Sequence, residues 1–135
     1  MAVVTVGGLI TRSLVSVRPD STVREAARLM RENRVGSVVV LDEAGRLAGI
    51  LTERDIAYRV VAEGRSYDTL VGEVMTRDVI TIREDATIAE AARLMIGLGV
   101  RHLPVVDVNG RVIGVVSLRD LARAIWGSYE PPMTP

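Results

Sequence analysis

The sequence predicts an α/β fold built from two copies of one unit. When the chain is shifted by 65 residues, residues 7–60 align without a gap to residues 72–125, and 21 of the 54 aligned pairs are identical. Within each copy, short apolar runs alternate with segments whose apolar residues recur at helical spacing. A repeated alternation of strand and helix indicates two similar α/β units within the 135 residues.

Each unit is predicted to open with a short strand and a helix. The strand covers residues 14–18 in the first copy and 79–83 in the second. The helix begins at a capping box, in which a threonine and a glutamate three residues later satisfy each other's backbone N–H groups. Small and apolar residues at helical spacing then follow in both copies: Val23, Ala26, Ala27, Met30, Ile88, Ala91, Ala92 and Met95.

A hairpin and a last helix complete each unit. The predicted strands of this part are 37–41 and 47–51 in the first copy, and 103–106 and 112–116 in the second. Turn residues at 42–45 and 107–110 join them, and the final helices begin at Glu53 and Leu118. The strands are apolar on both faces, and one unit is too small to close a core. We therefore expect the two units to pack through their sheets with pseudo-twofold symmetry.

Composition excludes several classes of function. The chain has 17 basic and 17 acidic residues, so no basic excess favours nucleic acid as a partner. Cysteine is absent and His102 is the only histidine, which argues against thiol catalysis and against a metal site. No nucleophile is paired with a base, so we do not expect an enzyme. No apolar run approaches the roughly 20 residues that span a bilayer, and we expect a cytoplasmic protein.

One stretch carries the functional prediction. Within residues 114–120 we predict a short apolar strand, which contains Val115 and ends at Ser117. The chain then passes directly into a helix, whose first turn contains Asp120. A helix start presents free backbone N–H groups and the positive end of the helix dipole, which favour an anion. Residues 49–55 repeat the pattern with Thr52 and Asp55. The alternative is a purely structural role, because Ser-x-x-Asp is also a helix-capping pattern.

These residues resemble a tandem pair of CBS motifs, the arrangement also called a Bateman module. The resemblance covers about residues 7–126 and rests on segments 71–76 and 101–107 and on the two Gly-x-x-Thr/Ser-x-x-Asp stretches. It implies an α/β fold in which two motifs pack through their sheets. It also implies disc-shaped homodimers and clefts that bind adenine-containing molecules.

The resemblance implies a cleft at each aspartate. A carboxylate can accept hydrogen bonds from both ribose hydroxyls, and the helix start with its hydroxyl can hold a phosphate. In the Asp120 cleft, the ribose and the phosphate would be bound by Asp120, Ser117 and His102. The residues expected around the base there are Ile10, Val15, Val35 and Gly36.

The second cleft has Asp55 and Thr52 at its helix start. The residues expected opposite them are Met75, Ile80, Val100 and Arg101. Arg101 and His102 stand where related modules often keep basic residues that contact phosphate, whereas the first copy has Gly36 and Ser37 there. The two clefts are therefore not equivalent, and we rank the Asp120 cleft first.

The resulting prediction is a regulatory, non-enzymatic module. It would bind AMP, ADP, ATP or S-adenosylmethionine as a regulatory ligand, with no obligatory cofactor, and signal to a separate effector protein. The alternative is a ligand-independent interaction or scaffold module. The expected organisation is motif 1 at 7–64, a linker at 65–70, motif 2 at 71–126 and a C-terminal tail at 127–135.

Overall fold

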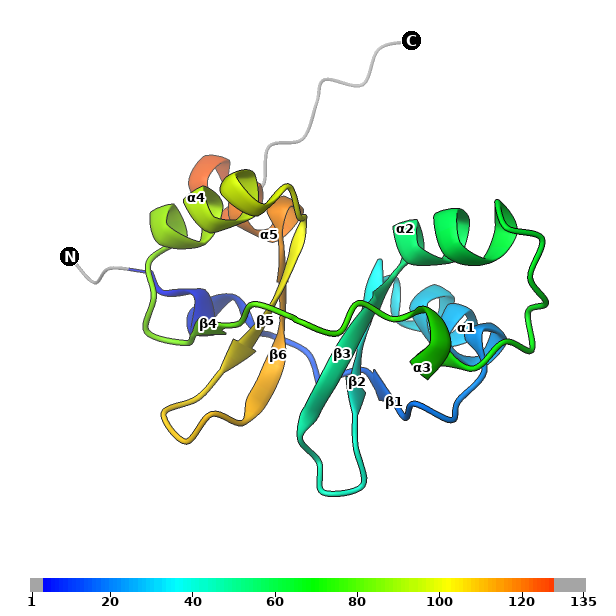
Figure 1. Cartoon of the computed structure of the whole chain (residues 1–135). Helices are drawn as coiled ribbons and strands as arrows, with labels where there is room; N and C mark the ends of the chain where they lie inside the picture. The colour runs from blue at the N-terminus through cyan, green and yellow to red at the C-terminus, as the bar shows by residue number, and fades with distance from the viewer. Residues whose placement is uncertain (1–3, 128–135) are drawn as a thin grey trace, which may run out of the picture.

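The computed structural model describes residues 4–127, which form two units standing side by side (Figure 1). Each unit contains a sheet of three strands, in the order β1–β2–β3 in one and β4–β5–β6 in the other. The first strand of each sheet is parallel to the middle strand, and the last strand is antiparallel to it. The predicted α/β fold with two repeated units is confirmed.

The elements follow the predicted order. Those of the first unit are β1 (Ser16–Val17), α1 (Val23–Asn33), β2 (Ser37–Leu41), β3 (Leu47–Thr52), α2 (Glu53–Asp55) and the π-helical η2 (Ile56–Val61). Those of the second unit are β4 (Ile82–Arg83), α4 (Ile88–Leu98), β5 (His102–Val106), β6 (Val112–Ser117) and α5 (Leu118–Trp126). Two short helices, η1 (Val6–Leu9) and α3 (Val71–Val74), were not predicted. The opening strands are shorter than predicted, because each pairs with its neighbour over two residues only.

Local signals account for where the long helices begin and end. Thr22 and Thr87 each accept a hydrogen bond from the backbone N–H three residues later, at 3.1 Å. In α4 the box is reciprocal, since Glu90 accepts the Thr87 N–H at 3.3 Å. Both helices end at a residue in the left-handed region, Arg34 with φ 55° and Gly99 with φ 68°. These ends fix the approach of the chain to β2 and β5.

The hairpin turns are held by aspartates. Asp42 accepts hydrogen bonds from the backbone N–H groups of Ala44 and Arg46, both at 2.9 Å, and Asp107 does the same in the second unit. The hydrogen bond from the Arg46 backbone is the main cause that lowers the pKa of the Asp42 carboxyl. These turns fix the register of each hairpin and so the position of the strand ends at Thr52 and Ser117.

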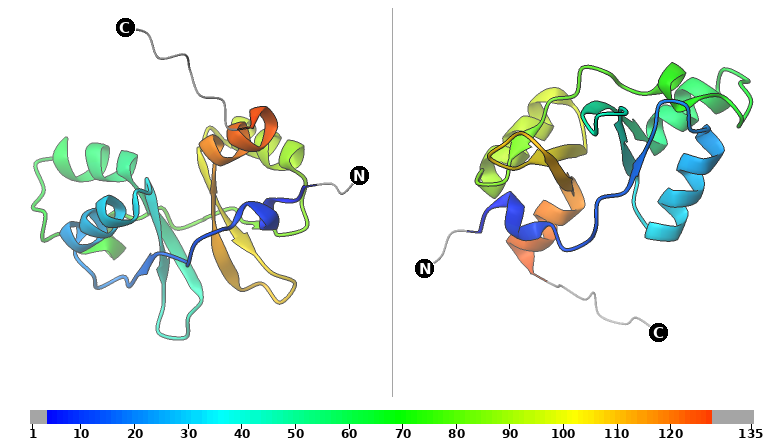
Figure 2. Two further views of the ribbon diagram at one scale, coloured as in Figure 1. Left: turned by 180° about the vertical axis from the view of Figure 1, so that it is seen from behind. Right: turned by 90° about the horizontal axis from the view of Figure 1, so that it is seen from below.

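Each hydrophobic core includes a short segment that, in the sequence, directly precedes the other unit. Val6, which precedes the first unit in the chain, is fully buried in the core of the second unit. Its backbone N–H donates to Ala86 O at 2.9 Å, and η1 lies against the second unit in Figure 2. Conversely Val71 and Val74 of α3 are buried in the core of the first unit, together with Met75. The segment before the first unit thus completes the core of the second unit, and the segment before the second unit completes the core of the first.

Two further predictions concern membrane-spanning helices and the C-terminal tail. Within residues 4–127, α1 and α4 are the longest helices at 11 residues each, and no helix there has the length and hydropathy to cross a membrane. The predicted tail at 127–135 lies, except for Gly127, outside the described residues.

Candidate functional site

Both predicted aspartates lie where a strand passes directly into a helix. Ser117 has extended backbone angles (φ −106°, ψ 161°) and ends β6, and α5 begins at the next residue. Its hydroxyl accepts the Asp120 N–H at 3.1 Å, while Asp120 Oδ2 accepts the Ser117 N–H at 2.8 Å. Thr52 and Asp55 form the same reciprocal pair at 3.1 and 2.9 Å. The capping role is therefore real at both places, and it occupies one carboxylate oxygen of each aspartate.

His102 lies beside the Asp120 helix start and reaches toward the first unit. It is paired with Ser117 in the register of β5 and β6, which brings both residues to the same end of the sheet. An added Cβ at Gly36 would lie 3.2 Å from His102 Nε2 and 3.1 Å from Glu53 Oε1. The absence of a side chain at Gly36 thus leaves room for the imidazole and the carboxylate where the two units meet.

The surroundings of His102 have opposing effects on the pKa of its imidazole. Burial lowers the pKa of the imidazole below its usual value, because desolvation penalises the charged form. The negative charges of Glu53 and Asp120 partly offset this, whereas Arg101 adds to the lowering. A bound anion at the same place would favour the protonated form.

The segments that precede the opening strands cross to the opposite sheet. Ile10 covers Gly114 in β6, where an added Cβ would lie 2.7 Å from its Cγ2 atom. Met75 covers Gly49 in β3, where an added Cβ would lie 2.8 Å from its sulfur. Ile10 therefore lies on the sheet that leads to Asp120, and Met75 lies on the sheet that leads to Asp55.

The other predicted residues have diverse environments. Val15 packs against the first core, and Val35 and Val115 are half-buried. The Arg101 side chain is exposed, but its carbonyl accepts the Leu118 N–H at 2.9 Å, so its backbone adjoins the start of α5. Ile80 and Val100 are exposed by 49% and 39%. These last two residues belong to the predicted apolar lining of the Asp55 cleft, and the structure leaves both side chains exposed.

Three residues near the aspartates were missed by the sequence reasoning. Thr76 donates its hydroxyl to Asp55 Oδ1 at 3.3 Å, and the Arg59 Nε lies 3.7 Å from the same oxygen. Glu53 adjoins Gly36 and His102. Thr76 is repeated as Thr11, which was an available signal. Arg59 and Glu53 have no such signal, because the second copy carries Ala124 and Leu118 at the equivalent positions.

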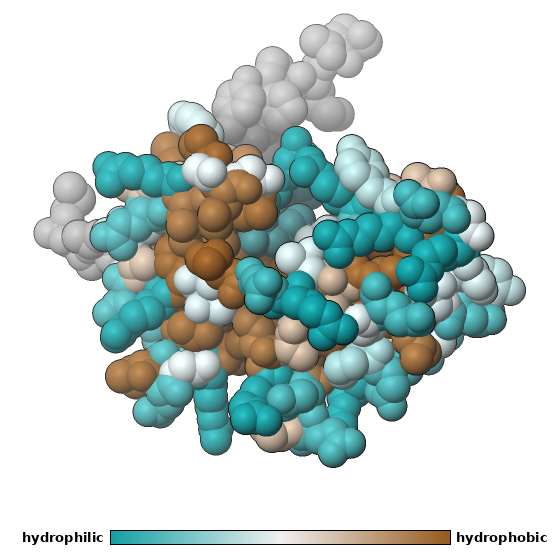
Figure 3. All heavy atoms as spheres, in the orientation of Figure 1, coloured by the Kyte–Doolittle hydropathy of each residue, from teal (hydrophilic) through white to brown (hydrophobic). Residues whose placement is uncertain are grey.

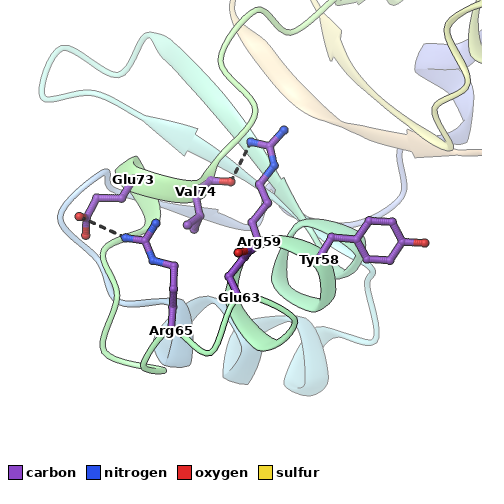
Figure 4. Close-up of a pocket in the computed structure, with 6 residues that line it drawn as sticks. All are labelled: Tyr58, Arg59, Glu63, Arg65, Glu73 and Val74. Carbon is purple, nitrogen blue, oxygen red and sulfur yellow. Dashed lines mark hydrogen bonds and ion pairs between the residues drawn. The ribbon is translucent and has the colours of Figure 1, made fainter.

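Two cavities lie on the first unit. One, of about 520 Å³, is lined by four charged residues together with Tyr58 and Val74, all from η2, α3 and the segment between them (Figure 4). The other, of about 630 Å³, lies between α1 and η2 and has Val23, Ile56 and Val60 among its lining residues. Neither contains a sequence-predicted site residue. Residues 4–127 also bring together no group of three His, Cys, Asp or Glu side chains suited to a metal ion.

Known proteins resemble this chain in both sequence and structure. A 17.7 kDa protein of Acidianus ambivalens is 42% identical over 120 residues, which is 89% of this chain and 72% of the relative. This chain covers 62% of a relative from Methanopyrus kandleri, at 40% identity.

Similar solved structures include complexes with adenine-containing ligands. A CBS domain protein of Pyrobaculum aerophilum, complexed with AMP, is 33% identical with a TM-score of 0.83, covering 90% of this chain and 95% of that one. The CBS domain pair of protein MJ0100, in complex with 5′-methylthioadenosine and S-adenosyl-L-methionine, is 29% identical with a TM-score of 0.84. That match covers 95% of this chain and 100% of the other.

The family is decided by the match of each half of the chain. The family model described as the CBS domain matches residues 6–62 and again residues 71–127. The two matches coincide with the two sheets and their helices, and each ends beyond a strand-to-helix aspartate. The chain therefore belongs to the CBS domain family and contains a tandem CBS pair.

Proposed function

We propose that this CBS pair is a regulatory module that binds an adenine-containing molecule in the cleft at Asp120. The observation that carries the proposal is the meeting of His102, Ser117 and Asp120 at the start of α5, where β5 begins and β6 ends. Structurally similar CBS proteins in complex with AMP and with S-adenosyl-L-methionine support the ligand class. The proposed ligands are AMP, ADP, ATP or S-adenosylmethionine.

Each proposed contact follows from the chemistry of the ligand. The Asp120 carboxylate accepts the ribose hydroxyls, and Ser117 with the backbone N–H groups of α5 holds the polar group at the 5′ position. His102 and Arg101 contribute positive charge for a phosphate. Val115 and Ile10, together with Val15, Val35 and Gly36, provide the base with an apolar surface and backbone polar groups.

The regulatory step is a shift between conformations. Ile10 and Gly36 come from the first half of the chain, whereas Asp120 and His102 come from the second. A ligand that contacts both halves favours the arrangement in which the cleft is closed, by the difference in its affinity for the two arrangements. The closed arrangement then changes the affinity for an effector protein. Absence of catalysis and a cytoplasmic location remain parts of the same proposal.

Calorimetric titration with the four proposed ligands tests this function. The wild-type protein is expected to bind at least one of them. Asp120→Asn keeps an oxygen that can accept the Ser117 N–H but loses the charge and one acceptor, so affinity falls about tenfold or more. No binding of any ligand at about millimolar concentration would contradict the proposal and favour the scaffold alternative.

A second copy of the chain is the proposed assembly partner. Hydrophobic residues gather over the upper left of the molecule in Figure 3, where α4 and α5 lie. The exposed large apolar residues of these two helices are Ile96, Leu98, Leu118, Ile125 and Trp126. At the positions equivalent to Ile96 and Leu118 the first unit carries Arg31 and Glu53. The difference favours an isologous dimer in which α4 and α5 meet the same helices of the second copy.

A further inference from the structure

The two aspartates that end the repeated motif differ in what their second carboxylate oxygen contacts. Asp55 Oδ1 accepts the Thr76 hydroxyl at 3.3 Å and lies 3.7 Å from Arg59 Nε, and the residue is only 8% exposed. Asp120 is half-buried, and within residues 4–127 its Oδ1 makes no hydrogen bond or ion pair. A ribose diol needs a carboxylate with open acceptor positions, and Asp120 leaves more of them open than Asp55, whose two oxygens each accept a hydrogen bond.

Arg59 also ties the first unit across its own cleft. Its guanidinium Nη1 donates to the carbonyl oxygens of Val74 and Met75, at 3.2 Å each, and Figure 4 shows the side chain extended toward Val74. The side chain therefore joins the helix after Asp55 to the segment that covers β3. The equivalent residue of the second unit is Ala124, which has no group for such a contact.

The helix that carries Arg59 is itself unlike its counterpart. After three α-helical residues the chain continues as the π-helix η2, with the Ala62 N–H donating to Ala57 O at 2.9 Å. In the second unit α5 is α-helical from Leu118 to Trp126. Short π-helical segments are rare and frequently occur at functional sites. Here the altered helix carries the guanidinium that spans the Asp55 cleft.

The backbone repeats the same difference. Ile50 and Thr76 form a β-bridge with hydrogen bonds of 3.0 and 2.9 Å, so the segment 74–76 lies directly on β3. The equivalent residues, Val115 and Thr11, form no bridge in the described part of the chain, and Thr11 is exposed. The segment before β1 approaches β6 through the Ile10 side chain, which can move without breaking backbone hydrogen bonds.

From these contacts we infer that Arg59 and Thr76 close the Asp55 cleft from within, so that the adenine-containing ligand occupies the Asp120 cleft alone, one molecule per chain. The inference rests on the proposed function, because it concerns where the same ligand binds. Arg59 is thus a positioning residue that decides stoichiometry, acting through Asp55 and the 74–76 segment.

The repeat supplies matched variants for the test. Arg59→Ala combined with Thr76→Ala frees the Asp55 carboxylate, and Ala124→Arg places the guanidinium in the second unit. Positions 59 and 124 are both exposed, so the fold should tolerate these changes, and circular dichroism melting checks this. AMP is the titrant, and calorimetry gives both stoichiometry and affinity.

The expected stoichiometries are one AMP per wild-type chain and two per chain of the double variant. Ala124→Arg is expected to weaken binding by about tenfold or more. Two sites in the wild type, one site in the folded double variant, or unchanged affinity in Ala124→Arg would each overturn the inference while leaving the proposed function intact. Failure of AMP and the other proposed ligands to bind the wild type would instead refute the proposed function.

Discussion

At the scale of single residues, the electrostatic surroundings of one side chain determine how the site responds to pH. His102 lies among Glu53, Asp120 and Arg101, and burial is the main cause that lowers its pKa. The neutral imidazole is therefore favoured in the folded protein relative to the unfolded chain. Because His102 is the only histidine, its titration is separable from that of other side chains near neutral pH.

We predict that stability falls as the solution is acidified below the usual histidine pKa of 6.5. With the folded pKa below the unfolded one, the unfolded chain binds more protons between the two values, so the unfolding free energy rises with pH there. The slope for one group is at most about 1.4 kcal/mol per pH unit. Urea unfolding from about pH 7.5 to about pH 5.5 measures it. His102→Gln should flatten the profile, and an unchanged profile in that variant would assign the effect to other groups.

At the scale of elements, the short segments before each unit contribute more than their length suggests. η1 has four residues, yet it places Val6 in the core of the second unit and Ile10 on Gly114. α3 likewise places Val71 and Val74 in the core of the first unit. Each short segment therefore packs one unit against a piece of chain that leads into the other unit.

Truncation of the Val6 side chain should therefore destabilise the second unit. Val6→Ala removes two fully buried methyl groups, and we expect a loss of about 1–3 kcal/mol in the free energy of unfolding. Val4→Ala is the matched control, because Val4 is 53% exposed and should have little effect. Urea midpoints at constant m value provide the measurement. Equal midpoints for the two variants would show that the N-terminal segment does not contribute to the core in solution.

At the scale of the whole molecule, the two units are alike in fold and unlike in surface. The second unit exposes apolar residues on α4 and α5, whereas the first carries charged residues at two of the equivalent positions, Arg31 and Glu53. The same asymmetry appears at the two strand-to-helix aspartates, because Arg59 and Thr76 contact Asp55 Oδ1, whereas Asp120 Oδ1 makes no hydrogen bond or ion pair within residues 4–127. The second unit thus combines the proposed ligand site with the proposed dimer surface, which would couple binding to assembly geometry.

A single charge on α4 should disrupt the proposed dimer. Ile96→Arg introduces the residue that the first unit has at the equivalent position, and desolvating its charge against a second copy is unfavourable. Val108→Arg is the control, because both side chains are 75% exposed and Val108 lies in a hairpin turn. Sedimentation should give a dimer for the wild type and for Val108→Arg, and a monomer for Ile96→Arg. A monomeric wild type, or dissociation by both variants, would argue against this surface.

The sequence by itself determined the two-unit α/β fold, because its signals are local. The Thr22 and Thr87 caps, the apolar strands and the hairpin turns each act within a few residues, and the repeat confirmed one unit by the other. The strand-to-helix positions of Asp55 and Asp120 follow in the same way. The ends of the middle strands were predicted within one residue, and only the short edge strands were overestimated.

Tertiary structure alone decided which residues of the two halves meet. The burial of Val6 in the second core, the approach of His102 to Gly36 and Glu53, and the contacts of Arg59 with Asp55 and Met75 all depend on how separate segments pack. A sequence repeat predicts that equivalent residues occupy equivalent positions in the fold of the two units. It does not predict different roles, because those arise from the positions where the copies differ and from the neighbours that packing brings to them.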